Sequence, residues 1–499
     1  MLKKILISSI SSILLSTSAH AAITSGQLIA IGSLNGSSAG VNADLSGLTN
    51  TLENGVAANF LGGLGSGVAY AGGNTFIAVP DRGPNATVYN SAVDDTSSYI
   101  SRFHTISMDL VANTSGSGYA YNLTPTLTST TLLSSATALN YGTGAGLGNK
   151  IDGITPIGSG APALNTTNNT YYFTGRSDNY GSANPITGVT DSTSANPSNG
   201  RYDPEGVRVS NDGLSVFVSD EYGPYVNQFN RITGERIKSF ALPANLAIAN
   251  QSPVGNTEIA NNPSGRVTNK GMEGLAITPD GSTLVGIMQA PLAQDVKASG
   301  NTRIVTIDIA TGITHEYAYH LTTGSGVSEI VAINNHEFLV DERDGNGLGA
   351  GNTASVKSLF KIDLAGATDV TNFSTTGSAA DKTALTNAAV TKTLFLDMVS
   401  TLNANGITSA NIPSKIEGVA FGPDITDNGA LFHTLYVGND NDFVPGTSGT
   451  NQFYVFAVGS NALNYQAQQF SAVPVPAAAW LFLTGLMGFL GLNRKRKAA

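Results

Sequence analysis

The stretch "PEGVRVSNDGLSVFVSDEYG" at residues 204–223 decides how the rest of the chain is interpreted. Apolar residues alternate in both of its halves, and Asn-Asp-Gly stands between them at 211–213. Alternation around an Asn-Asp-Gly turn predicts a β-hairpin with a buried face. The second strand then ends on Asp220, Glu221 and Tyr222, which is unusual for a strand that enters a core.

The same plan of strand, turn, strand and polar cluster recurs along the chain. Further copies lie at residues 65–83, 272–291, 328–345 and 416–442. Because short strands repeated radially in units of four form a β-propeller, we predict an all-β protein built as one β-propeller of about six or seven four-stranded blades. The strand-like stretch at 170–179 is included in that number as part of an extra blade. A two-sheet sandwich is the alternative, since irregular repeats with many turns also suit it.

A propeller explains the polar ends of these hairpins. Its innermost strands line a central channel, so residues at equivalent strand ends converge although they lie far apart in the sequence. The candidate metal-ligating residues at such positions are Asp81, Glu205, Asp220, Glu273, Glu329, Asp344, Glu417, Asp440 and Asp442. The candidate catalytic residues are Arg82, Glu221, Glu342 and Arg343.

These residue types indicate a particular chemistry. Carboxylate and amide oxygens are the ligands that Ca²⁺ prefers, and bound cations can assist hydrolysis. Arginine side chains at the same mouth can clamp a phosphate with paired hydrogen bonds. The alternative is that the carboxylates pair with arginines and backbone amides and hold the blades together.

Composition narrows the class of protein. Hydrophobic residues make up 41% of the chain and charged residues 12%, with 57 glycines, which suits a turn-rich β protein. The net charge of −10 argues against nucleic acid as a partner. The absence of cysteine excludes thiol nucleophiles, Cys-ligated metals and disulfides.

Both ends of the chain have the patterns of targeting segments. Residues 1–21 combine Lys3 and Lys4 with an apolar stretch and Ala-His-Ala, which predicts a secretory signal peptide. Residues 471–499 contain an uncharged run from 473 to 492 followed by four basic residues, which predicts a transmembrane helix with a cytoplasmic basic end. The domain between them is expected at 22–470. Without the six basic residues of the two ends, 19 basic and 35 acidic residues remain, a net charge of −16.

The C-terminal stretch "VPVPAAAWLFLTGLMGFLGLNRKRKAA" (473–499) resembles the PEP-CTERM sorting tail in its Val-Pro-Leu-Pro-Ala variant, with Val475 in place of the leucine. That resemblance implies processing by an exosortase-type enzyme. It also implies transient anchoring in the inner membrane of a Gram-negative bacterium and delivery to the cell surface or the extracellular matrix. A permanent single-span anchor is the alternative.

The repeats themselves resemble the phytase-like domain, also named for the esterase-like activity of phytase. The motifs that carry this resemblance are "DPEGV" (203–207), "SDEYGPY" (219–225), "NKGMEGLAITPDG" (269–281), "FLVDERD" (338–344), "KIEGVAF" (415–421) and "NDNDF" (439–443). The opening unit "GGLGSGVAY" with "VPDRGPN" (62–85) also fits, whereas the loops at 112–200 depart from the pattern. The family implies a propeller that hydrolyses esters.

The function expected from the sequence is therefore an exported, phytase-like hydrolase of phosphate or carboxylic esters, with Ca²⁺ as the possible cofactor. Its expected partners are a small-molecule ester, the processing enzyme and an extracellular polymer. The alternative is a binding module of the cell surface or matrix that has no turnover, since propellers commonly bind ligands at the funnel and the sequence lacks a compact Ser-His-Asp or zinc set.

Overall fold

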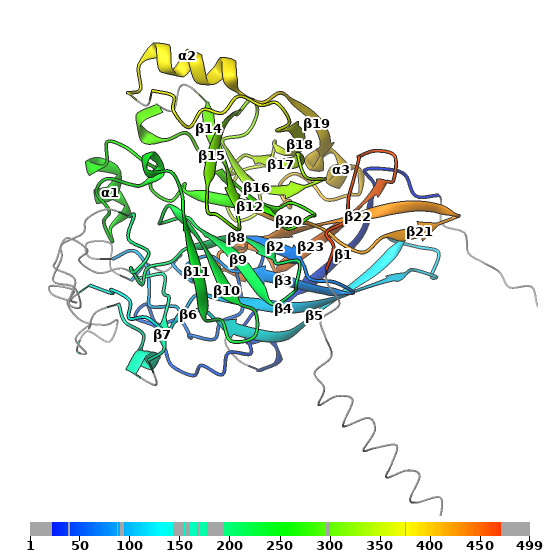
Figure 1. The fold of residues 1–499 in the computed structure, drawn as a ribbon. Coiled ribbons are helices and arrows are strands. Elements are labelled where there is room, and N and C mark those ends of the chain that lie inside the picture. The colour runs from blue at the N-terminus through cyan, green and yellow to red at the C-terminus, as the bar shows by residue number, and fades with distance from the viewer. Residues whose placement is uncertain are drawn as a thin grey trace, which may run out of the picture.

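The computed structural model describes residues 22–37, 40–86, 88–89, 94–142, 154, 160–166, 169–176, 194–295, 300–374 and 376–470. Five four-stranded antiparallel sheets stand around a common axis. Their innermost strands gather at the centre of the molecule (Figure 1), and each contacts the innermost strand of the next sheet until the ring closes. The protein is therefore an all-β propeller, as predicted, and the two-sheet sandwich is wrong.

Four blades are built in chain order from the axis outward. The first blade holds β2 (Gly67–Tyr70), β3 (Thr75–Val79), β4 (Arg102–Ala112) and β5 (Tyr121–Leu132). The second holds β8 (Pro204–Val209), β9 (Ser215–Asp220), β10 (Tyr225–Asn230) and β11 (Arg236–Ala241). The third holds β12 (Met272–Ile277), β13 (Thr283–Met288), β14 (Asn301–Asp308) and β15 (Thr314–His320). The fourth holds β16 (Gly326–Ala332), β17 (Glu337–Arg343), β18 (Lys357–Asp363) and β19 (Lys392–Asp397).

The fifth blade joins the two ends of the domain. It holds β20 (Ile416–Phe421), β22 (Ala430–Asn439), β23 (Asn451–Gly459) and, outermost, β1 (Leu28–Leu34), with the short β21 (Ile425–Asp427) paired to β22. The first strand in the sequence thus pairs antiparallel with the last, and Ile31 lies opposite Tyr454. This pairing closes the ring without leaving an open seam between blades.

The blade number is lower than predicted. Of the stretch at 170–179 the structure describes residues 170–176, which contribute β7 (Tyr171–Tyr172), paired with β6 (Ser134–Ser135) as a two-stranded sheet. The β4–β5 hairpin uses 23 residues for its strands and forms the outer half of the first blade, so these residues do not add a further blade. The prediction of six or seven blades is wrong because the strand-like residues near 171 form a two-stranded sheet and not a four-stranded blade.

In the part of the chain that the structure describes, the α-helices are short and lie in the connections between strands. They are α1 (Gly255–Asn261), α2 (Ala379–Ala388), α3 (Met398–Ala404) and α4 (Pro445–Ser448). Ser378 begins α2 with a reciprocal capping box to Asp381, which satisfies backbone donors of the first turn. Within the described ranges, no helix is long and apolar enough to cross a membrane. The predicted signal peptide and sorting tail lie outside those ranges.

The hydrophobic core is divided among the seams between blades. Each seam packs one face of a blade against the next, as where Phe217 and Val226 of the second blade meet Leu275 and Val305 of the third. Equivalent clusters fill the other four seams. Both faces of the inner strands are covered in this way, and every residue of β8, β12 and β20 is buried, the charged ones included.

One ion pair closes the central channel. The Arg208 guanidinium donates to the carbonyl oxygens of Val68 (2.8 Å), Val207 (2.6 Å), Ile330 (2.8 Å) and Val419 (3.2 Å), which belong to β2, β8, β16 and β20. Its Nη2 also lies 3.1 Å from the Glu329 carboxylate. That carboxylate accepts from the Leu275 backbone N–H of β12 at 2.9 Å. Together, the two side chains therefore bond all five inner strands.

Replacing Arg208 is expected to destabilise the propeller strongly. Arg208→Met leaves the buried Glu329 charge and several channel carbonyls without partners, and breaking a buried pair in this way costs about 3–5 kcal/mol. Equilibrium denaturation measures the loss. Arg231→Met is the control, because this arginine is half-buried and makes one 3.3 Å bond to the Gly213 carbonyl. Equal stability of Arg208→Met and the unmodified protein would contradict this role of the pair.

Candidate functional site

A cavity of about 230 Å³ lies at the end of the channel where the inner strands begin. All five blades contribute to it, because each presents there the start of its inner strand or the end of its second strand. Its charged lining residues are Asp81, Arg82, Glu205, Glu221, Lys270, Glu273, Arg343, Lys415 and Glu417. The repeats therefore converge as the sequence predicted.

A β-bulge turns the leading glutamates toward this cavity. The register with the second strand shifts between Pro204 and Val207 in β8 and between Ile416 and Val419 in β20. In β12 it shifts across Glu273. A bulge leaves a residue outside the ladder and re-aims its side chain, which here brings three glutamates to the channel mouth.

Glycine after the glutamate lets the inner strands approach each other. A Cβ on Gly274 would meet the Cα of Glu329 at 2.7 Å, and one on Gly206 would meet the Leu275 nitrogen at 2.5 Å. Real Cβ atoms essentially never come that close. The Glu-Gly pair is therefore a requirement of a narrow five-bladed channel as well as of the site.

Asp203, Glu205 and Glu221 form the first carboxylate group of the site, here called the Glu205 cluster. One carboxylate oxygen from each lies within 4.8 Å of the others. Arg82 reaches two of the three, with its Nη1 2.5 Å from Asp203 Oδ2 and 3.5 Å from Glu221 Oε2. Glu205 is 5% exposed, and its carboxylate receives no hydrogen bond or ion pair from the residues that the structure describes.

Burial raises the pKa of Glu205 well above its ordinary value, and the charges of Glu273, Asp203 and Glu221 raise it further. The pKa of Glu221 is raised by burial and by Glu273 and Asp203, against the opposing effect of Arg82. Three carboxylates with one guanidinium thus carry more negative charge than the protein itself neutralises. A bound cation or a proton can supply the missing charge.

Asp81, Asp440 and Asp442 form the second group, here called the Lys415 cluster. Lys415 Nζ lies 2.6 Å from Asp440 Oδ2 and 2.7 Å from Asp442 Oδ1. Burial alone would lower the pKa of Lys415, but Asp440, Glu417 and Asp442 outweigh it and hold that pKa well above the ordinary value. The ammonium group therefore stays charged and occupies the position that a metal cation would need.

Arg343 joins the third and fifth blades across the cavity. Its Nη2 lies 2.6 Å from Glu417 Oε1 and 3.5 Å from Glu273 Oε1, and its Nε donates to the Ser328 hydroxyl. Gln289 donates to Glu273 Oε1 at 2.6 Å. Burial and the charge of Glu417 raise the pKa of Glu273 to about 7. Glu273 can therefore exchange a proton near neutral pH.

Four predicted site residues point away from the cavity. Asp220 accepts the backbone N–H groups of Asp203 and Tyr222 and so shapes the turn. Glu329 pairs with Arg208 in the channel. Glu342 is buried against Lys392 and accepts from the Tyr319 hydroxyl.

Asp344 is the fourth of these residues and lies 2.9 Å from Lys357 Nζ. It also accepts from the Ser355 hydroxyl at 2.6 Å. Asp344 and Glu342 therefore hold neighbouring strands and loops together, which is the structural role that the sequence left open as the alternative.

The register explains why Glu329 differs from the other leading glutamates. In β16 the bulge falls on Ser328, so Glu329 stays in the ladder opposite Asp341. Ser328 takes the bulge position that Glu273 has in β12, and both side chains contact Arg343. A shift of one residue moves a strand side chain to the other face.

Sequence reasoning missed Asp203, Lys270 and Lys415. Asp203 and Lys415 each stand two residues before a leading glutamate. Since side chains two apart on an extended strand share a face, this spacing was the signal that could have found them. Lys270 has no such spacing, and only the fold brings it to the cavity wall.

Backbone strain gathers near the site. Asn269, Asp442 and Phe443 have φ angles of 55°, 51° and 56°, which non-glycine residues seldom adopt. Asn269 lines the cavity and Asp442 belongs to the Lys415 cluster. Strained residues of this kind persist where the surrounding structure enforces them, often at functional sites.

Comparison with known proteins identifies the family. The profile of the phytase-like family, described as esterase-like activity of phytase, matches residues 59–443, and the chain belongs to that family. An "Uncharacterized secreted protein" of Arthroderma benhamiae is 30% identical over 178 residues, covering 29% of this chain and 34% of that relative. The matched part is thus about a third of the relative's length.

Solved structures resemble this chain only distantly. Hydrazine synthase of Kuenenia stuttgartiensis is 11% identical, with 76% of this chain and 78% of that chain covered and a TM-score of 0.27. The Swd1 β-propeller domain of Myceliophteria thermophila is 9% identical, with 47% and 50% covered and a TM-score of 0.21.

Asp341 of β17, which lies opposite Glu329 in the ladder, makes the stability of the protein depend on pH. It is fully buried, and neither carboxylate oxygen has a hydrogen bond within the described part of the chain. Burial raises its pKa from 3.8 to about 8. The folded state therefore keeps a proton that the unfolded state loses, and the free energy of unfolding falls as pH rises from about 4 to 8.

Asp341→Asn is expected to match the unmodified protein at pH 4 and to exceed its stability at pH 8 by several kcal/mol, since linkage gives about 1.4 kcal/mol for each pH unit between the unfolded and the folded pKa. Asp344→Asn is the matched control, for which we expect a change in stability of the opposite sign at pH 8. Burial would raise the pKa of Asp344, but Ser355 and Lys357 hold it below the ordinary value, so its loss destabilises at pH 8. Urea denaturation at both pH values measures this, and a destabilised Asp341→Asn at pH 8 would contradict the interpretation.

Proposed function

We propose that this phytase-like propeller is an exported hydrolase of phosphate or carboxylic esters that uses a divalent cation. The observation that carries the proposal is the Glu205 carboxylate, which is buried, lines the cavity and receives no bond from the described residues. It stands beside two further carboxylates whose charge Arg82 only partly offsets. A buried carboxylate without a partner destabilises the folded protein unless a ligand or a proton neutralises its charge.

The donor set of the Glu205 cluster suits Ca²⁺. Asp203, Glu205 and Glu221 offer only oxygen atoms, and Ca²⁺ accepts mixed carboxylate and water ligands in flexible geometry. The Lys415 cluster does not suit it, because the lysine ammonium already contacts Asp440 and Asp442. A cation at the Glu205 cluster would polarise a substrate oxygen and lower the pKa of a bound water.

Cationic side chains around the cavity favour an anionic substrate group. Arg82 and Arg343 face the cavity from different blades, each already oriented by carboxylates. Lys270 makes no ion pair with the residues that the structure describes, so its ammonium is available to a ligand. Phosphate esters therefore fit better than uncharged acyl esters, since guanidinium and ammonium groups bind phosphoryl oxygens with charge-assisted bonds.

Among the residues of the cavity, a glutamate is the best candidate for proton transfer. Glu273, with its pKa of about 7, lies between Arg343 and Gln289 and can accept or release a proton at neutral pH. General acid–base catalysis is most effective when the pKa lies near the working pH. We assign Glu273 to proton transfer to the leaving group, and Glu221 with Glu205 to positioning the attacking water.

Export is part of the proposal. The signal-peptide pattern of residues 1–21 motivates it, and the relative named as a secreted protein supports it. We further propose that residues 471–499 act as a sorting tail that an exosortase-type enzyme removes, which would leave the propeller at the cell surface or in the matrix. Mass spectrometry of the mature protein would show whether this tail has been removed.

A binding module without turnover is the second candidate. Arg82, Arg343 and Lys415 are each held by carboxylates, an arrangement that can also serve only to fasten the blades at the funnel. In that case an extracellular polymer would occupy the cavity mouth and no product would form.

The proposal predicts hydrolysis that depends on Ca²⁺. The purified protein is assayed with p-nitrophenyl phosphate, phytate and p-nitrophenyl acetate, in Ca²⁺ and in EDTA. We expect turnover of at least one phosphate ester, loss in EDTA and recovery on adding Ca²⁺. Glu205→Gln should lower kcat/KM by about 100-fold or more, since it removes a cation ligand.

Two controls separate the possible failures. Glu235→Gln changes an exposed glutamate on a blade turn and should leave turnover unchanged. Asp442→Asn should keep the Ca²⁺-induced rise in melting temperature that Glu205→Gln loses, because Lys415 occupies its cluster. No turnover with any substrate, although Ca²⁺ still raises the melting temperature, would reject the hydrolase and favour the binding module.

A further inference from the structure

A second cavity lies at the opposite end of the channel, on the far side of the Arg208 guanidinium. Its volume is about 330 Å³, and the ends of the inner strands form its floor. Arg208 lines it but offers nothing to a ligand, because four backbone carbonyls and Glu329 already engage the guanidinium. The two cavities are therefore separate sites on opposite faces of the propeller.

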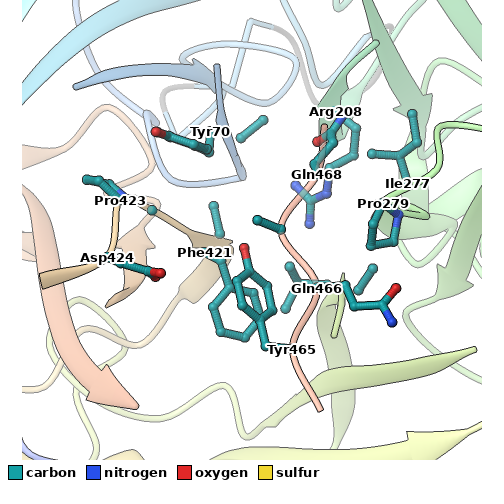
Figure 2. Close-up of a pocket in the computed structure, with 16 residues that line it drawn as sticks. Tyr70, Arg208, Ile277, Pro279, Phe421, Pro423, Asp424, Tyr465, Gln466 and Gln468 are labelled. Carbon is teal, nitrogen blue, oxygen red and sulfur yellow. The ribbon is translucent and has the colours of Figure 1, made fainter. Parts of the chain in front are cut away.

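The C-terminal segment 460–470 crosses this second face and forms one wall of the cavity (Figure 2). The Gln466 backbone N–H donates to the Ile333 carbonyl at 2.8 Å. Gln468 donates to the Val209 carbonyl and to the Asn211 side chain, both at 2.7 Å. These bonds attach the segment to the second and fourth blades, so the wall is a built part of the fold.

Aromatic rings and one carboxylate surround the half of the cavity next to the fifth blade. Figure 2 shows Tyr70, Phe421, Asp424 and Tyr465 around this half, with Ile277 and Pro279 on the other side of the segment. Tyr465 packs on Phe421 with ring centroids 4.2 Å apart. Its hydroxyl has no hydrogen bond to the described residues.

Asp424 gives this half of the cavity a negative charge. One of its oxygens lies 2.8 Å from His433 Nδ1, which leaves the second oxygen for a ligand. Burial raises the pKa of both Tyr70 and Tyr465, and the Asp424 charge raises each further, so both phenols lie within its field. The cavity thus presents acceptor oxygens and aromatic faces, and its one guanidinium is already occupied.

We propose that this second cavity binds a small organic cation that carries an aliphatic ammonium group. The ammonium would donate to Asp424 and to the phenol oxygens of Tyr70 and Tyr465, and it would lie against the aromatic faces. A carboxylate beside aromatic rings attracts such cations both through charge and through the ring quadrupole. The aliphatic chain would lie over the apolar floor formed by Ala69, Ala420 and Phe421.

Isothermal titration calorimetry of the full chain with n-butylammonium at pH 7 and 0.15 M NaCl tests the proposal. We expect saturable binding at one site, and binding of 1-butanol weaker by at least about tenfold, since the alcohol has the same chain without the charge. Asp424→Asn should weaken n-butylammonium binding by at least about tenfold, and Tyr465→Leu should weaken it as well.

Asp363→Asn is the matched control, because Asp363 forms a similar exposed pair with His336 on another blade. It should leave binding unchanged. The proposal is overturned if Asp424→Asn binds n-butylammonium as tightly as the unmodified protein does, or if 1-butanol or glucose binds as well as the ammonium. Binding that survives Asp424→Asn but is lost in Glu205→Gln would place the amine in the first cavity and would also overturn it.

Discussion

The structure depends on the way Arg208 and Glu329 fill the centre of the propeller. Arg208 donates to carbonyl oxygens of four inner strands, and Glu329 accepts from a backbone N–H of the fifth. These bonds satisfy buried backbone groups that would otherwise lack hydrogen-bond partners at the axis. Five strands leave little space around the axis, and glycines such as Gly274 permit the close approach. The pair also lies between two cavities, so each face of the propeller has a cavity with its own lining residues.

On the first face, bulges and charge balance determine what the cavity can do. The bulges at Glu205, Glu273 and Glu417 bring buried carboxylates close together. Without positive charge nearby, so many buried negative charges would destabilise the fold. Lys415 supplies that charge for the aspartates of its cluster. In the Glu205 cluster, Arg82 contacts two of the three carboxylates and leaves Glu205 without a partner among the described residues. The Lys415 cluster is therefore held by its own lysine, whereas the Glu205 cluster is available to a ligand.

The sequence predicts the convergence of the repeats but not the direction of each side chain. Glu205, Glu221, Glu273 and Glu417 could be foreseen, because equivalent ends of radial repeats must meet at one mouth. Glu342 could not, because it alternates with Arg343 on β17 and therefore faces Lys392 of β19 in the same blade. The bulge at Ser328 removes Glu329 from the mouth in the same way, by one residue of register. The blade number was overestimated because strand-like residues near 171 form only a two-residue strand without a full sheet.

An anomalous difference map from crystals of the protein grown with Ca²⁺ and soaked with Tb³⁺ tests whether the Glu205 cluster binds a cation. We expect a peak at the Glu205 cluster, about 2.3–2.6 Å from oxygens of Asp203, Glu205 and Glu221, and none between Asp440 and Asp442. A peak at the Lys415 cluster with none at Glu205, or no peak at either cluster, would contradict this expectation.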